Sequence, residues 1–105
     1  MANNLIVELK TAVGLSAEQI QQGIMMRAGN EAENFDDLQY WLSGLSSVPI
    51  WANKAAALWV IELWMQDRDG CQADSLLAVD KKYSRMLRGF SMAEIISMRY
   101  QIESK

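Results

Sequence analysis

Few side chains in this chain of 105 residues could carry out acid–base, nucleophilic or metal chemistry. Histidine, the commonest general base near neutral pH and the commonest metal ligand, is absent. Cysteine occurs once, at Cys71, and the carboxylates and lysines form no recognisable catalytic arrangement. We therefore expect a protein that is not an enzyme, with no catalytic residues, no cofactor and no metal site.

The segment QDRDGCQAD combines acids with a glycine, as calcium-binding loops do. If Gly70 is placed at the invariant glycine of such a loop, Met65 falls at the first ligand and Leu76 at the position of the bidentate acid. Both essential carboxylates are then missing. The segment is predicted to be an ordinary polar connection.

Positive charge is concentrated at the C-terminal end of the chain. Residues 1–80 hold four basic and eleven acidic side chains, a net charge of −7, whereas residues 81–105 hold six and two, a net charge of +4. Lys81, Arg85 and Arg88 have the i, i+4, i+7 spacing of one helix face. We call these three residues the basic strip. They indicate either a surface that binds phosphates or an acidic partner, or a solvated helix face, which is the more common role.

The segment RGFSMAEII, which follows this strip, resembles the turn and second helix of helix-turn-helix DNA readers. Four residues match the glycine, the apolar turn residue, the helix cap and the buried aliphatic residue of that motif: Gly89, Phe90, Ser91 and Ile95. Arg85 stands where the motif normally has a small residue, and Arg88 where it is usually apolar. The resemblance implies a transcriptional regulator that would use residues 81–99. An isoelectric point near 4.8 makes nucleic acid the less favoured partner.

Apolar spacing and capping residues predict an all-α chain of about five to six short helices. Ser16 with Gln19, and Ser91 with Glu94, have the spacing at which a side chain and a backbone cap each other at a helix start. Glycines at positions 14, 29 and 89 and the segment SGLSSVP supply the breaks. The expected helices cover residues 5–13, 16–28, 35–45, 48–66, 75–88 and 91–102.

The segment WANKAAALWVIELWMQ, residues 51–66, is apolar at nearly every angle of a helix. It does not fit a membrane span, which needs roughly 20 consecutive apolar residues, because Lys54 and Glu62 interrupt it. A helix that is hydrophobic all round is normally surrounded by other helices. We expect residues 48–66 to be the central hydrophobic helix of a compact bundle, and residues 1–105 to form a single all-helical domain.

Four tryptophans and seven methionines are a large stock of adaptable apolar surface for a chain of this length. Such residues fill irregular cores, but they are also enriched at protein interfaces. For a single residue, burial in the core is the better expectation. Taken together, the tryptophans exceed what six short helices readily bury, so we expect Trp51 and Trp59, with the basic strip, to contact a partner, and a homodimer is compatible with this surface.

The N-terminal segment has no basic flank before its apolar run, and a lone cysteine is best tolerated in a reducing compartment, so we expect a cytoplasmic protein without membrane association. The first hypothesis is a small, acidic, non-enzymatic protein that binds another macromolecule, with a protein as the expected partner. An adaptor, an inhibitor, a regulatory subunit or an anti-host or anti-defence protein of a mobile element would fit this class. The alternative is the helix-turn-helix-like DNA-binding regulator.

Overall fold

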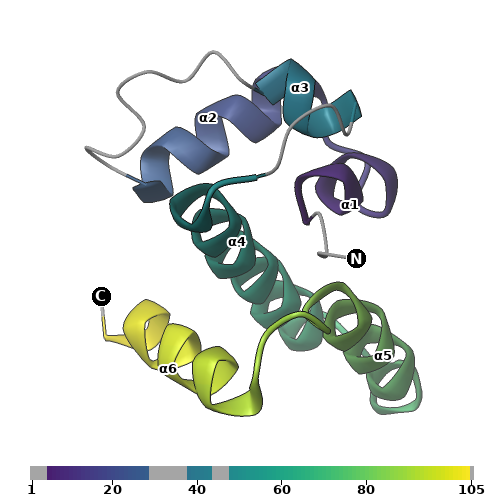
Figure 1. Ribbon diagram of the computed structural model, residues 1–105. Helices are drawn as coiled ribbons and strands as arrows, with labels where there is room; N and C mark the ends of the chain where they lie inside the picture. Colours follow the sequence, from purple (N-terminus) through teal and green to yellow (C-terminus); the bar gives the residue numbers. More distant parts are fainter. Residues whose placement is uncertain (1–4, 29–37, 44–47, 105) are drawn as a thin grey trace. The chain divides into compact units, whose positions relative to one another are not determined.

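The computed structural model describes residues 5–28, 38–43 and 48–104 (Figure 1). Every regular element in these residues is a helix, which confirms the predicted all-α class. None of the helices in the described ranges has the length and apolar character needed to cross a membrane. The elements are α1 (Leu5–Thr11), α2 (Ala17–Ala28), α3 (Leu38–Ser43), α4 (Ile50–Asp69), the 3-10 helix η2 (Ala73–Ser75), α5 (Leu76–Met86) and α6 (Met92–Glu103).

The chain divides into two compact units, of which one covers residues 5–59 and the other residues 60–104 of the described chain. Helix α4 belongs to both, because its first ten residues lie in the first unit and its last ten in the second. The expectation of a single domain stays a prediction.

In the first unit, α1 packs against α2 and α3. Gly14 ends the α1 segment with a φ of 87°, a left-handed conformation that favours glycine. The predicted cap of α2 is present, since the Ser16 N–H donates to Oε1 of Gln19 at 2.9 Å and the Gln19 N–H donates to Oγ of Ser16 at 3.2 Å. The core of this unit consists of Leu5, Ile6, Leu9, Ile20, Ile24, Leu38, Trp41, Ala52, Ala55, Ala56 and Ala57.

The third predicted helix is observed only over Leu38–Ser43. The sequence predicts Asn34 or Asp36 as the cap of this helix and an apolar stripe of Phe35, Leu38, Trp41, Leu42 and Leu45. Both caps, Phe35 and Leu45 lie outside the described residues. Leu38 and Trp41 are buried, as the predicted stripe requires.

Helix α4 begins at Ile50 and continues to Asp69, so it starts two residues later and ends three residues later than predicted. The polar residues at its C-terminal end stay helical because the second unit supplies partners for them: Tyr83 donates to Asp67, and Arg68 binds Asp80. The Gly70 N–H then donates to the Gln66 carbonyl and closes the helix.

The second unit contains the end of α4, η2, α5 and α6 (Figure 1). Its buried side chains are Val60, Ile61, Tyr83, Met86, Leu87 and Met98. The apolar spacing along α5 predicts a stripe of Leu76, Val79, Tyr83 and Met86. Tyr83 and Met86 are buried, and Leu76 and Val79 are half-buried. The apolar spacing along α6 predicts a buried stripe of Met92, Ile95, Met98 and Ile102. This prediction is wrong at Met92, which is exposed, whereas Met98 is buried.

Candidate protein-binding surface

Helix α6 begins at a capping box that the sequence predicts. The Ser91 N–H donates to Oε1 of Glu94 at 3.0 Å, and the Glu94 N–H donates to Oγ of Ser91 at 3.2 Å. The bond from the Ser91 backbone, followed by that involving the Ser91 side chain, lowers the pKa of Glu94. This cap fixes where the helix starts.

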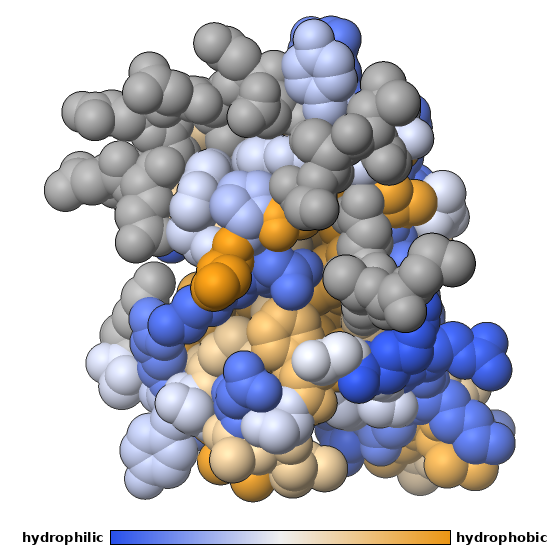
Figure 2. All heavy atoms as spheres, viewed as in Figure 1, coloured by the Kyte–Doolittle hydropathy of each residue, from blue (hydrophilic) through white to orange (hydrophobic). Residues whose placement is uncertain are grey.

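Three large apolar side chains project from the outer face of α6, and we call them the α6 ridge: Met92, Ile96 and Tyr100. They are 71%, 55% and 73% exposed. Residues four apart on a helix differ by about 40° in direction, so all three lie on one face. Figure 2 shows hydrophobic side chains at the surface among hydrophilic ones. With Met98 buried on its inner side, α6 is apolar on two sides.

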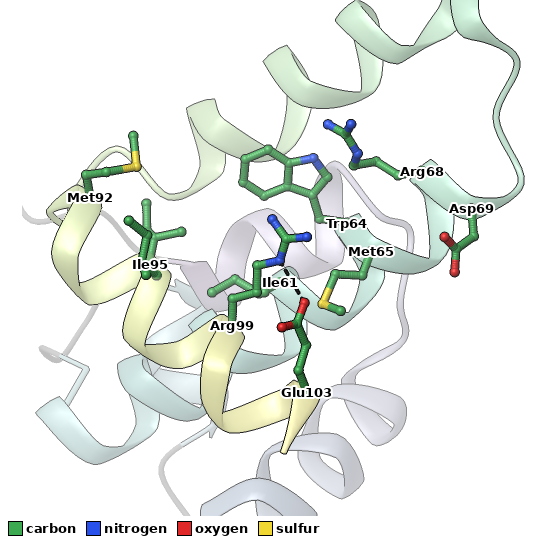
Figure 3. A pocket seen from close by; sticks show the side chains of 10 residues that line it. Ile61, Trp64, Met65, Arg68, Asp69, Met92, Ile95, Arg99 and Glu103 are labelled. Atoms are coloured by element: carbon green, nitrogen blue, oxygen red, sulfur yellow. Dashed lines mark hydrogen bonds and ion pairs between the residues drawn. The ribbon is translucent and has the colours of Figure 1, made fainter. Parts of the chain in front are cut away.

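A groove of about 390 Å³ lies beside the ridge, between the C-terminal half of α4 and α6 (Figure 3). Apolar side chains from both helices point towards this space. The full lining consists of Ile61, Trp64, Met65, Arg68 and Asp69 from α4 and Met92, Ile95, Ile96, Arg99 and Glu103 from α6. Met92 and Ile96 belong to both groove and ridge, so the two form one continuous surface.

The charged side chains of the groove are largely committed to ion pairs within the unit. Nε of Arg99 lies 3.1 Å from Oε1 of Glu103, one helical turn away (Figure 3). Nη1 of Arg68 contacts both carboxylate oxygens of Asp80, at 2.7 and 2.8 Å. The groove therefore combines apolar side chains with the Arg99–Glu103 and Arg68–Asp80 pairs, which suits a partly apolar helix or strand better than a strongly charged ligand.

The α4 wall of this groove is held by contacts with α5. The Trp64 indole N–H donates to Asp80 at 2.8 Å, and its ring stacks on Tyr83 with 6.1 Å between ring centroids. This indole bond, followed by the Arg68 guanidinium, lowers the pKa of Asp80. Burial, followed by the hydrogen bond to Asp67, raises the pKa of the Tyr83 phenol. Trp64 is thus fixed in direction, as a wall of a preformed groove should be.

The basic strip is exposed on the second unit, but it is not continuous along one helix. Lys81 and Arg85 lie in α5, whereas Arg88 lies two residues beyond its last residue, Met86. Nη1 of Arg88 donates to the Arg85 carbonyl at 2.8 Å. Arg88 therefore satisfies a carbonyl at the end of the helix, which is a common local role for a cation at that position.

Trp51 and Trp59 lie in the first unit and are both half-buried. Trp51 makes an edge-to-face contact with Trp41, at 5.8 Å between ring centroids and 73° between planes. The guanidinium carbon of Arg27 lies 4.7 Å from the centroid of the Trp59 ring, which also packs directly on Gly23. Both rings have partners within the unit, so the indole surface left for another molecule is smaller than the sequence analysis anticipated.

The α6 ridge does not follow from the stripe predicted for this helix, because that stripe places Met92 on the inner face. A signal was present: the apolar residues of α6 follow two interleaved spacings, one through Ile95, Met98 and Ile102 and another, at four-residue intervals, through Met92, Ile96 and Tyr100. One helix face packed on a core explains only the first spacing.

The described part of the chain holds no group of three His, Cys, Asp or Glu side chains placed to bind a metal ion. No protein-family model, no curated protein and no solved structure matches this chain, so a function has to be inferred from its own surface.

Proposed function

We propose that this protein acts by binding another protein through the α4–α6 groove and the α6 ridge, as an adaptor, an inhibitor or a regulatory subunit. One observation carries the proposal: α6 exposes Met92, Ile96 and Tyr100 in a row beside an apolar groove. Surface hydrophobic residues scattered singly are ordinary, whereas contiguous ones beside a groove mark interaction sites.

A protein fits this surface better than a small molecule does. The groove volume is near the lower end of the range of roughly 300–1,000 Å³ for small-molecule sites. The ridge, however, projects outwards and continues from the groove, so a ligand confined to the groove would leave Tyr100 uncovered. A partner helix can cover both, with its own apolar face as the contact.

The proposal is tested by capturing a partner protein and then by measuring its binding with purified components. The tagged full chain is used to capture proteins from the cells that produce it, and a captured protein is purified and titrated against parent and variants. Ile96→Asp should weaken the affinity at least tenfold, which is about 1.4 kcal/mol, because it places a carboxylate in an apolar contact. Leu77→Asp is the matched control, since Leu77 is exposed on α5 and does not line the groove. If both variants bind like the parent, the surface is not the binding site.

A DNA-binding regulator is the second candidate, supported by the exposed Lys81 and Arg85 on α5 and by the short turn before α6. Met92 and Ile96 on the outer face of α6 count against it, because their side chains cannot form the hydrogen bonds that read base edges. The two candidates therefore use different residues, and variants of the basic strip and of the ridge separate them.

A further inference from the structure

Asp80 in α5 binds two side chains of the groove without lining the groove itself. Its Oδ1 accepts from the Trp64 indole N–H at 2.8 Å and from Nη1 of Arg68 at 2.7 Å, and its Oδ2 accepts from the same Arg68 nitrogen at 2.8 Å. Trp64 and Arg68 line the groove, whereas Asp80 does not. A residue outside the groove therefore sets the position and the net charge of part of its wall.

We propose that Asp80 determines the specificity of the groove: because it compensates the charge of Arg68, the groove selects neutral apolar groups over anionic ones. The inference rests on the groove used in the proposed function and names the chemistry that the occupant presents there. Asp80 acts through Arg68 and is therefore a positioning residue, which need not touch the bound molecule.

The Arg68 guanidinium is the group that Asp80 controls. Its side chain is 46% exposed and lines the groove, so it is within reach of a molecule bound there. An uncompensated guanidinium attracts carboxylate, sulfonate and phosphate groups. In this structure its Nη1 instead contacts both oxygens of Asp80, beside the indole nitrogen of Trp64 (Figure 3). The lowered pKa of Asp80 keeps this carboxylate ionised near neutral pH.

The acids of the groove lining do not replace Asp80. Asp69 follows Arg68 in α4, but Figure 3 shows its carboxylate pointing away from the Arg68 guanidinium. Glu103 is paired with Arg99 on its own helix, at 3.1 Å. Neither acid of the described groove lining therefore pairs with Arg68. Loss of the Asp80 charge should leave one uncompensated cation in the groove.

Two fluorescent probes with the same aromatic rings test this inference: N-phenylnaphthylamine, which is neutral, and anilinonaphthalene sulfonate, which is anionic. Each probe is titrated against the full chain, and the ratio of the two dissociation constants measures the preference for a neutral group. Asp80→Asn keeps the size of the side chain and an oxygen that can accept from Trp64, but removes the charge. At low salt the ratio should shift about two- to fivefold towards the sulfonate, as expected for one partly exposed ion pair.

The controls separate the charge of Arg68 from other effects of the substitution. Adding Arg68→Gln to Asp80→Asn should restore the ratio of the parent. Asp74→Asn removes the same charge at an exposed position outside the groove lining and should leave the ratio unchanged. The shift should shrink at about 1 M salt, because salt screens the attraction. A variant with a merely loosened fold would weaken the binding of both probes without changing their ratio.

Ile96→Asn tests whether the probes bind in the groove, because Ile96 belongs to the groove lining. It should weaken the binding of both probes. Leu77→Asn, at an exposed position outside the groove lining, should weaken neither.

The outcomes separate this inference from the proposed function. The inference is overturned by an unchanged ratio in Asp80→Asn, by a shift that Asp74→Asn reproduces or Arg68→Gln does not reverse, or by a parent that binds neither probe. Probe binding that Ile96→Asn leaves intact also overturns it. In each of these cases, capture of a protein whose affinity Ile96→Asp weakens still supports the proposed function. If the expected shift appears and no protein binds the groove, the inference is supported and the proposed function fails.

Discussion

The indole N–H of Trp64 in α4 donates a hydrogen bond of 2.8 Å to the Asp80 carboxylate in α5, and Arg68 binds the same carboxylate. Two donors from one helix thus converge on one acceptor of another. Because Trp64 also forms part of the groove wall, this bond couples the packing of α5 to the shape of the groove. We expect substitutions at Asp80 to affect both stability and the groove.

Asp80→Asn should make the free energy of unfolding less dependent on acid pH. The folded-state pKa of Asp80 is below its ordinary value of 3.8, so its ionised form stabilises the fold above that value, and this contribution is lost as the pH falls through the folded-state pKa. Urea unfolding between pH 7 and pH 2 measures the free energy of unfolding of the parent and of the variant. The difference between the two free energies should shrink below pH 3.8. A difference that stays constant with pH would contradict the lowered pKa of Asp80.

In a double-mutant cycle, the effects of Trp64→Phe and Asp80→Asn on the free energy of unfolding should not be additive.

Gly23→Ala should destabilise the first unit although alanine is the better helix former. A Cβ at this position would overlap the six-membered ring of Trp59, which packs against the α2 backbone. We expect a loss of about 1–3 kcal/mol, as for an overpacked core, against a gain of about 1 kcal/mol in helix propensity. The measurement is urea unfolding. Gln22→Ala, at the exposed neighbouring position, is the control and should change the free energy by less than about 0.5 kcal/mol.

Ser91→Ala should remove the cap of α6 and cost about 1 kcal/mol of unfolding free energy. The variant takes the Oγ acceptor away from the Glu94 N–H, whereas the bond from the backbone N–H of residue 91 to Oε1 of Glu94 does not need the serine side chain. Ser97→Ala, in the middle of the same helix and exposed, is the matched control. Chemical denaturation is the measurement, and equal stability of the two variants would show that α6 does not depend on this cap.

Ala57→Asp should unfold the domain or lower its stability by more than about 4 kcal/mol. Ala57 in α4 is fully buried, and no buried polar or charged residue is found in the described chain to compensate a carboxylate there. Lys54→Asp, one turn earlier on the exposed side of the same helix, should fold. Circular dichroism and thermal melting compare the two. Parent-like melting of the Ala57 variant would place this helix at the periphery.

Lys81→Gln with Arg85→Gln should leave the fold intact, because both side chains are exposed. We expect little duplex binding by the parent near physiological salt. If the parent does bind duplex DNA, the double variant should reduce the salt slope by about two units, close to one per lost phosphate contact. Lys10→Gln with Lys54→Gln removes the same charge elsewhere and should leave that slope unchanged. Arg88 is left in place, since it also contacts the Arg85 carbonyl.

The starts of α2 and α6 were predictable because capping is local: Ser16 with Gln19 and Ser91 with Glu94 need only a spacing of three residues. The end of α4 was not predictable from local sequence. Asp67 and Arg68 remain helical through contacts with Tyr83 and Asp80, which lie more than ten residues away in the chain. Composition alone indicates a polar turn in that segment.

The candidate site was less predictable than the fold. Charge clustering correctly indicated that Lys81 and Arg85 are exposed, but periodicity could not reveal that α5 ends before Arg88. Counting tryptophans drew attention to Trp51 and Trp59, although each ring finds a partner in its own unit. Which face of α6 is exposed depends on what packs against it, so the ridge becomes evident only in the structure.

Helix α4 supplies ten residues to each unit, and no loop divides it. An isolated helix of ten residues is shorter than the roughly 12–15 residues that remain helical in water, so neither half of α4 is stable on its own. Loss of one unit therefore frays its own half of α4 and removes the helical neighbours of the other half. Unfolding should proceed as one cooperative transition, with a single midpoint by fluorescence and by circular dichroism, and the amides near Val60 should exchange only through this global opening.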